Sequence, residues 1–96
     1  MRYHFSAQVW RYSGQAAWHF ATLPKTLSRR IAGFAPRLGP FGALPVRAAI
    51  GRAHWRTSIF PDRKAGAYLL PIKAEVRKTA GIGAGDRVRI RLELDL

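Results

Sequence analysis

The fold is decided by residues 25–34, which read KTLSRRIAGF, because residues 73–82, KAEVRKTAGI, line up on them without a gap. Lysine, arginine, alanine and glycine recur at matching positions, and a basic residue follows the arginine in both copies. A Leu-Pro pair precedes each copy, at Leu23-Pro24 and Leu70-Pro71, and closes a run typical of a strand. A repeat of about half the chain indicates duplication of one unit within a domain.

The apolar pattern predicts six strands, at residues 3–11, 18–23, 44–50, 54–60, 67–71 and 87–95. The last strand alternates most regularly, with Val88, Ile90 and Leu92 on one side and arginines on the other. Two short helices are expected, one from Pro24 to Gly33 and one over residues 73–80. Proline suits the first turn of a helix, and Gly33 is placed to end one in a left-handed conformation.

These elements predict a mainly β, six-stranded double-split β-barrel made of two pseudo-repeats, residues 3–50 and 53–96, each with one short helix. Ninety-six residues suit a single domain over 1–96. The core should hold Phe5, Val9, Trp18, Phe20, Leu27, Ile31, Val46, Ile50, Trp55, Ile59, Leu70, Val76, Val88, Ile90 and Leu92. Trp10 is the exception among the tryptophans, because it falls on the strand face opposite Phe5 and Val9.

The chain is strongly basic, with 17 Lys and Arg against 5 Asp and Glu and a net charge of +12. Such a charge predicts attraction to polyanions, of which nucleic acid is the commonest. Most of the basic residues are arginine and the chain is rich in alanine and glycine, so the bias of a GC-rich genome explains the same charge without a binding role.

Other classes of protein are disfavoured by what the sequence lacks. There is no cysteine, which excludes disulfides and thiolate metal sites. No apolar run reaches the roughly 20 residues that cross a bilayer, and the N-terminal residues lack the apolar stretch of a signal peptide. We therefore expect a cytoplasmic protein with no membrane or metal partner.

The second unit carries most of a resemblance that covers nearly the whole chain. Residues 55–62 (WRTSIFPD), Gly66, residues 68–73 (YLLPIK) and Gly85-Asp86 are similar to an uncharacterised bacterial family classed as a domain of unknown function. The resemblance implies a double-split β-barrel and no particular activity.

Residues 70–90 also resemble the DNA-binding half of AbrB-type transition-state regulators and MazE-type antitoxins. In those proteins a strand ends in Ile-Pro, a short helix carries paired basic residues, and a Gly-Asp turn starts the next strand. The paired arginines of that helix help contact DNA, and Arg77-Lys78 and Arg29-Arg30 occupy the matching positions here. Those regulators build the barrel from two chains, so two copies in one chain predict a monomer.

We hypothesise a non-catalytic protein whose partner is DNA or RNA. Basic side chains at matching positions of two units could meet successive phosphates, and arginine could add bidentate contacts. The candidate residues are Lys25, Arg29, Arg30, Lys73, Arg77, Lys78, Arg89 and Arg91, with Arg47, Arg56 and Arg87 widening the surface. The alternative is that these residues are solvated faces that keep a small barrel soluble.

Two further alternatives stay open. The aromatic residues could form a stacking platform for single strands, although tryptophans beside small residues more often belong to a core; these residues are Trp10, Trp18, Trp55, Tyr3, Tyr12 and Tyr68. Alternatively, the protein could be an accessory module that binds a small anion or a partner protein. Its site would be lined by Trp55, Arg56, Tyr68 and Lys73 and covered by the loop at 35–42. One basic stripe would favour a polyanion, whereas evenly scattered charge with a concave aromatic pocket would favour this module.

Catalysis has little support in the sequence. His4, His19 and His54 each stand alone on a strand, and no paired carboxylates are expected in a cleft. The glycines at 81, 83 and 85 lead into a strand and not into a helix, so they do not form a phosphate loop. We expect no enzyme activity, no cofactor and no metal.

Overall fold

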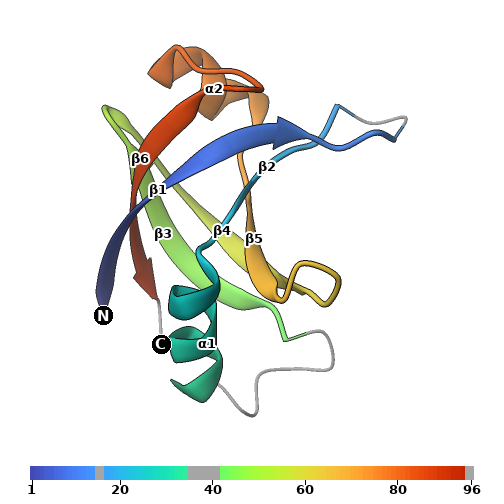
Figure 1. Cartoon of the computed structure of the whole chain (residues 1–96). Coiled ribbons are helices and arrows are strands. Elements are labelled where there is room, and N and C mark those ends of the chain that lie inside the picture. Colours follow the sequence, from blue (N-terminus) through green and yellow to red (C-terminus); the bar gives the residue numbers. More distant parts are fainter. Residues whose placement is uncertain (15–16, 35–41, 95–96) are drawn as a thin grey trace.

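A computed structural model describes residues 1–14, 17–34 and 42–94 and forms a closed barrel of antiparallel strands with two short helices. The elements are β1 (Arg2–Arg11), β2 (His19–Thr22), α1 (Lys25–Phe34), β3 (Leu44–Ile50), β4 (Ala53–Asp62), β5 (Ala67–Pro71), α2 (Ala74–Ala80) and β6 (Arg87–Leu94) (Figure 1). Neighbouring strands follow the cyclic order β1-β2-β5-β4-β3-β6. The mainly β class, the six strands and the two helices are thereby confirmed.

The strands β1 and β4 are the longest and belong to both sides of the barrel. On one side, which we call the β6/β3 side, β1 pairs with β6 over residues 2–8, and β3 pairs with β4 over its whole length. On the other, the β2/β5 side, β1 pairs with β2 only over residues 9–11, and β5 bridges β2 and β4. The two sides therefore differ in how long their ladders are.

The barrel interior is filled by aliphatic side chains that alternate with outward-facing ones along each strand. Twelve residues of the expected core are buried: Phe5, Val9, Ile31, Val46, Ile50, Trp55, Ile59, Leu70, Val76, Val88, Ile90 and Leu92. Leu27 is partly buried against this cluster. The placement of Trp18 in the core is wrong, because its exposed fraction is 55%.

Strand pairing explains the error at Trp18. Val9 points inward and pairs with Ala21, and residues directly opposite each other in a sheet share a face. Ala21 therefore points inward, and Phe20 turns outward beside its own partner, Trp10. Phe20 is half-buried there, so its expected place in the core is also corrected.

The two helices lie at opposite ends of the barrel (Figure 1). The first follows Pro24 as expected and is tied to β5, because the Ser28 hydroxyl accepts a hydrogen bond of 3.0 Å from the Tyr68 N–H. The expectation that Gly33 ends this helix in a left-handed conformation is wrong: Gly33 has no positive φ and lies inside α1. The second helix does end this way, at Gly81 with φ of 68°, whose N–H bonds to the carbonyls of Arg77 and Lys78.

The strand order has a symmetry of its own. Exchanging β1 with β4, β2 with β5 and β3 with β6 leaves the cyclic order unchanged. A two-fold relation between halves of the chain requires this property. The double-split type and the pseudo-repeats at 3–50 and 53–96 stay predictions. Within the described ranges, neither helix is long and apolar enough to cross a membrane.

Candidate functional site

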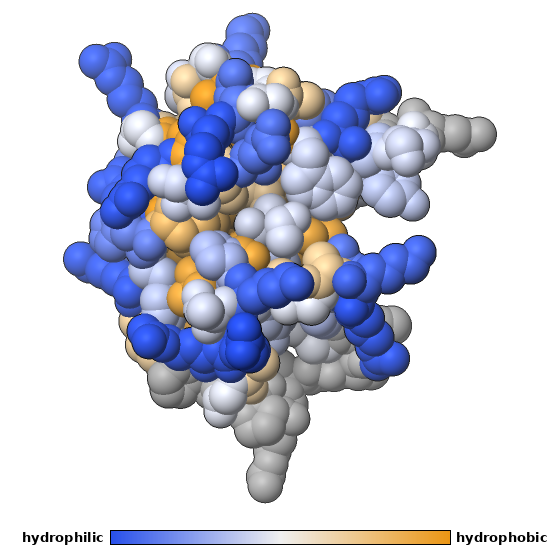
Figure 2. Space-filling view, viewed as in Figure 1, coloured by the Kyte–Doolittle hydropathy of each residue, from blue (hydrophilic) through white to orange (hydrophobic). Residues whose placement is uncertain are grey.

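Basic side chains gather on the outside of the β6/β3 side. Because Val88, Ile90 and Leu92 point inward along β6, the arginines between them point outward. We call this surface the basic face; its exposed members are Arg2, His4, Arg47, His54, Arg56, Arg87, Arg89 and Arg91. Figure 2 shows hydrophilic side chains along the left edge of the molecule, where β6 and the start of β1 run in Figure 1.

One cross-strand row of residues on the basic face has a small side chain between longer ones. His4 pairs with Arg91, Arg91 with Ala49, and Ala49 with His54. Ala49 is small and buried, so the longer side chains on either side of it form the walls of a cleft of about 340 Å³. The cleft can receive an anionic group between two histidines and an arginine.

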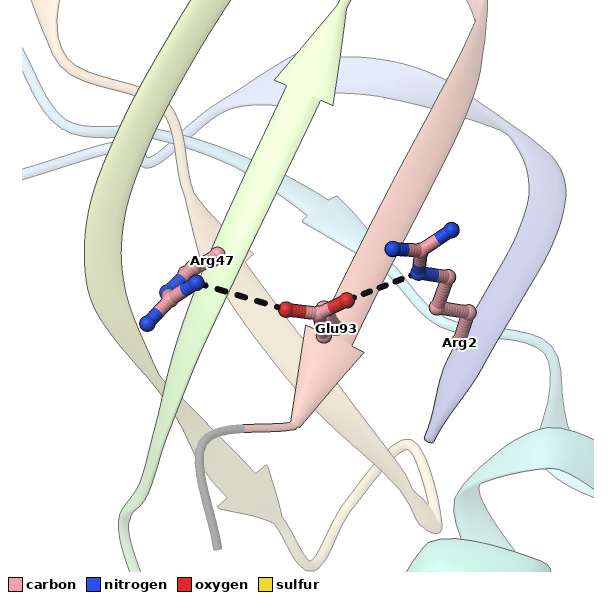
Figure 3. A network of polar contacts seen from close by, with 3 residues as sticks. All are labelled: Arg2, Arg47 and Glu93. Carbon is pink, nitrogen blue, oxygen red and sulfur yellow. Dashed lines mark hydrogen bonds and ion pairs between the residues drawn. The ribbon is translucent and has the colours of Figure 1, made fainter.

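The neighbouring row contains the one acidic residue of this cleft, Glu93 (Figure 3). Its carboxylate accepts a hydrogen bond of 2.8 Å from Arg2 Nε and forms an ion pair of 3.5 Å with Arg47 Nη1. The hydrogen bond from Arg2 lowers the pKa of the Glu93 carboxyl, and the charges of Arg2 and Arg47 act in the same direction. Glu93 thus holds two arginines side by side and neutralises part of their charge.

The basic face shares clefts with one cation on α1 and with one just before α2. Arg30 of α1 lines a cleft with Tyr3 and His4. Lys73, just before α2, lines another with Arg52 and His54. His4 and His54 also line the central cleft, so neighbouring clefts share these residues; we call the series of three clefts from Arg30 to Lys73 the basic tract.

The structure separates the other predicted binding residues from one another. Arg29 turns away from Arg30 and lines a cleft with Asp62 and Tyr68. Arg77 is half-buried, and its Nη1 donates a hydrogen bond of 2.7 Å to the Ile72 carbonyl. Lys25 and Lys78 are exposed on α1 and α2. The pairs Arg29-Arg30 and Arg77-Lys78 therefore do not form one patch, whereas Arg30, Lys73, Arg89 and Arg91 all border the tract or lie on its face.

The β2/β5 side carries aromatic residues that sequence reasoning placed mainly in the core. Trp10 and Phe20 have ring centroids 5.2 Å apart, and Trp18 stacks on Phe20 at 6.1 Å with an interplanar angle of 7°. Trp10 Nε1 donates a hydrogen bond of 2.9 Å to Thr22 Oγ1. We call these three residues the aromatic ledge. The outward position of Trp10 was the available signal, because its strand partner must share that face.

A second cleft lies beside this ledge. It measures about 330 Å³ and is lined by Trp18, His19, Pro71, Ile72, Lys73 and Arg77. Lys73 therefore borders both this cleft and the end of the basic tract. Lys73 and the exposed indole ring of Trp18 thus line the same cleft.

The residues of the alternative ligand pocket do not converge. Trp55 is buried in the core, whereas the next residue of β4, Arg56, is exposed on the opposite face. Tyr68 lies in the wall next to α1, where burial raises the pKa of its hydroxyl, and Lys73 lies beside α2 at the other end. Of the loop at 35–42 that was expected to cover the pocket, residues 35–41 lie outside the described residues.

Candidate ligands for a metal do not cluster: in residues 1–14, 17–34 and 42–94, no three His, Cys, Asp or Glu side chains come together. His4 and His54 lie in one row of the basic face, separated by Arg91 and Ala49. Asp62 and Asp86 accept backbone hydrogen bonds from Lys64 and Gly83 in turns, which is a local structural role.

Comparison with known proteins places the chain by family alone. No curated protein matches it. A family model described as Domain of unknown function (DUF1905) matches residues 5–92, which include both helices, β2 to β5, and most of β1 and β6. The chain therefore belongs to the DUF1905 family, whose domain has no assigned function.

Proposed function

We propose that this barrel binds nucleic acid without catalysis, using the basic tract and the face around it. The observation that carries this proposal is the line of shared clefts from Arg30 through His4, Arg91 and His54 to Lys73. A polyanionic backbone needs cations at repeated intervals along a path, and this surface supplies them from both helical ends and the strands between.

The chemistry of the side chains suits phosphate groups. Arginine presents a planar fork of donors that matches phosphate oxygens in a bidentate manner. The net charge of +12 adds a long-range attraction to any polyanion. The same charge opposes self-association, in keeping with a monomer.

The similarity of residues 70–90 to AbrB-type regulators supports a DNA partner, but through a different surface from the one it implied. Among the paired basic residues of the two helices, Arg30 borders the basic tract, whereas Arg77 donates a hydrogen bond to the Ile72 carbonyl. Strand arginines therefore take the main role in this proposal and helix residues contribute at the two ends.

The test is fluorescence anisotropy with labelled single-stranded and duplex DNA and RNA over about 50 to 200 mM salt. Arg89→Ala/Arg91→Ala removes two exposed cations of the basic face, and Arg63→Ala/Lys64→Ala removes two from the turn between β4 and β5. Each lost phosphate contact lowers the salt slope by about 0.7 on single strands and about 0.9 on duplex. The first variant should lose about 1.4 or 1.8 from the slope, and the second should match the wild type.

A single-residue comparison sharpens this test. Arg30 and Arg29 are adjacent and exposed, yet only Arg30 shares a cleft with His4. Arg30→Ala should therefore weaken binding more than Arg29→Ala. Equal weakening by both, or by both double variants, would mean that the charge acts without a defined surface and would contradict the proposal.

A small anion is the second candidate, favoured by the 340 Å³ cleft between His4, Arg91 and His54. Calorimetry with inorganic phosphate and pyrophosphate distinguishes the two. Saturable phosphate binding that is lost in Arg91→Ala, with no binding of oligonucleotides, would favour the small anion.

A further inference from the structure

We propose, building on nucleic-acid binding at the basic face, that the aromatic ledge is a base-stacking site and that the preferred ligand is single-stranded. Trp18, Phe20 and Trp10 form the ledge on the outside of the β2/β5 side. An unpaired base stacked on Trp18 would place its phosphate beside Lys73, where the basic tract begins.

The indole of Trp18 is held in a position suited to stacking. It is 55% exposed, and it packs nearly parallel to Phe20, with an interplanar angle of 7°. Phe20 is in turn braced by Trp10, which is anchored through its hydrogen bond to Thr22. A ring supported in this way loses little conformational freedom when a base covers its open surface.

The cleft beside Trp18 supplies the charge that a nucleotide needs. Lys73 and Arg77 line it together with Trp18, and Pro71 and Ile72 provide an apolar floor. Arg77 is already bonded to the Ile72 carbonyl, which fixes its guanidinium near the cleft. An apolar floor with a cation at its rim fits a flat base joined to a phosphate.

Lys73 connects this site to the rest of the tract. It lines the cleft beside Trp18 and also the cleft that contains Arg52 and His54. A strand with one base on Trp18 can therefore continue over His54 and Arg91 without leaving a basic surface. The site thus lies at the end of a path and is not an isolated patch.

Single-stranded nucleic acid fits the ledge better than other occupants. In a duplex the faces of the bases are already stacked, so an indole ring cannot cover them without unstacking. A second copy of this chain would bring another +12 to the surface and be repelled. Charge complementarity therefore selects an anionic partner with exposed π faces.

The test compares single-stranded oligonucleotides of about 12 nucleotides with a hairpin duplex for wild type, Trp18→Ala, Trp18→Phe and Phe60→Ala. Phe60 is the matched control, because its side chain is exposed by 42% and lies on β4, which β5 separates from β2 and the ledge. Loss of one stacked base should reduce single-strand affinity by about 5- to 150-fold in Trp18→Ala. Duplex affinity should stay within about twofold, Trp18→Phe should retain most of the binding, and Phe60→Ala should match the wild type.

Two failures are distinguishable. The stacking site is overturned if salt-dependent binding is intact but Trp18→Ala weakens the binding of single strand and duplex equally, or weakens neither. In that case the proposal of nucleic-acid binding at the basic face is retained. If Arg89→Ala/Arg91→Ala has no effect on any nucleic acid, the proposed function itself fails. Quenching of tryptophan emission by the single strand, present in the wild type and lost in Trp18→Phe, would support the site directly, and unchanged quenching would overturn it.

Discussion

The two sides of the barrel enclose the same aliphatic interior but carry different side chains on their outer surfaces. On the β6/β3 side the ladders are long, running over residues 2–8 of β1 and all of β3, and their outward positions carry arginine and histidine. On the β2/β5 side the ladders cover only residues 9–11 of β1 and 20–22 of β2, and their outward positions carry Trp10 and Phe20. A long ladder sets charges at regular spacing, whereas the short one displays few but large rings. The comparison shows that a single barrel core can position an array of cations on one outer surface and the aromatic ledge on another.

The largest effect is expected from breaking the interior that both sides share. Ile90 is fully buried on β6 between Arg89 and Arg91. Ile90→Ala leaves a cavity and should lower the free energy of unfolding by about 2 to 5 kcal/mol, measured by urea denaturation. Arg89→Ala, its outward-facing neighbour, should change stability by less than about 0.5 kcal/mol. Equal losses in the two variants would contradict the inward and outward alternation of β6.

A smaller effect is expected on the aromatic side alone. Thr22→Val removes the oxygen that accepts the hydrogen bond from Trp10 Nε1 while keeping the shape of the side chain. The unfolding free energy should fall by about 0.5 to 1.5 kcal/mol, because the partly buried indole N–H then pairs at best with water. Thr79→Val, at an exposed position of α2, is the control and should be close to neutral. If both variants were equally stable, the ledge would not depend on this bond.

The smallest change in stability is expected at Glu93 on the basic side. The pKa of its carboxyl is lowered, chiefly by the hydrogen bond from Arg2, so the ionised form is favoured in the folded state. Its contribution is therefore present above the ordinary pKa of a glutamate and is lost as the pH falls through the lowered value. The small stability difference between wild type and Glu93→Gln, measured by urea unfolding at several pH values, should vanish in acid. A difference that persists below both pKa values would contradict the ion pair as its cause.

The same substitution should strengthen oligonucleotide binding, although it lowers the stability of the fold. Glu93→Gln frees Arg2 and Arg47 from the carboxylate and should tighten oligonucleotide binding a few-fold. Asp62→Asn makes the same change of charge in the turn after β4 and keeps an oxygen for the Lys64 N–H. Anisotropy titration of both variants separates a local effect on the basic face from a general effect of net charge.

Much of the fold could be predicted because the strands of the β6/β3 side alternate cleanly. In β6, Val88, Ile90 and Leu92 are buried and the arginines between them are exposed, as the pattern of the sequence indicates. Pro24 marked the start of α1 for a local steric reason that needs no tertiary information, and the Leu-Pro pair at Leu70-Pro71 marked the end of β5. The presence of Arg89 and Arg91 on one surface follows from the same alternation.

The β2/β5 side was harder to predict, because β2 has only four residues and is apolar at consecutive positions. Phe20 and Ala21 each suit the interior, and a shift of one residue exchanges which of them points inward. The choice is made by pairing with β1, where Val9 meets Ala21. Likewise the sequence shows that Arg29 and Arg30 are adjacent, but only the packing of α1 decides which of them borders His4.

Every strand of this closed barrel has a paired neighbour on both sides, so its protection against edge-to-edge aggregation depends on its weakest seam. That seam is the ladder between β2 and β5, where Phe20 meets Pro71, Ala21 meets Leu70, and Thr22 meets Leu69. This junction joins the two shortest strands of the barrel and contains only these three residue pairs, so few ladder bonds hold it closed. Transient opening would begin there and would expose two edges at once, which makes the β2/β5 seam the place where two copies would exchange strands.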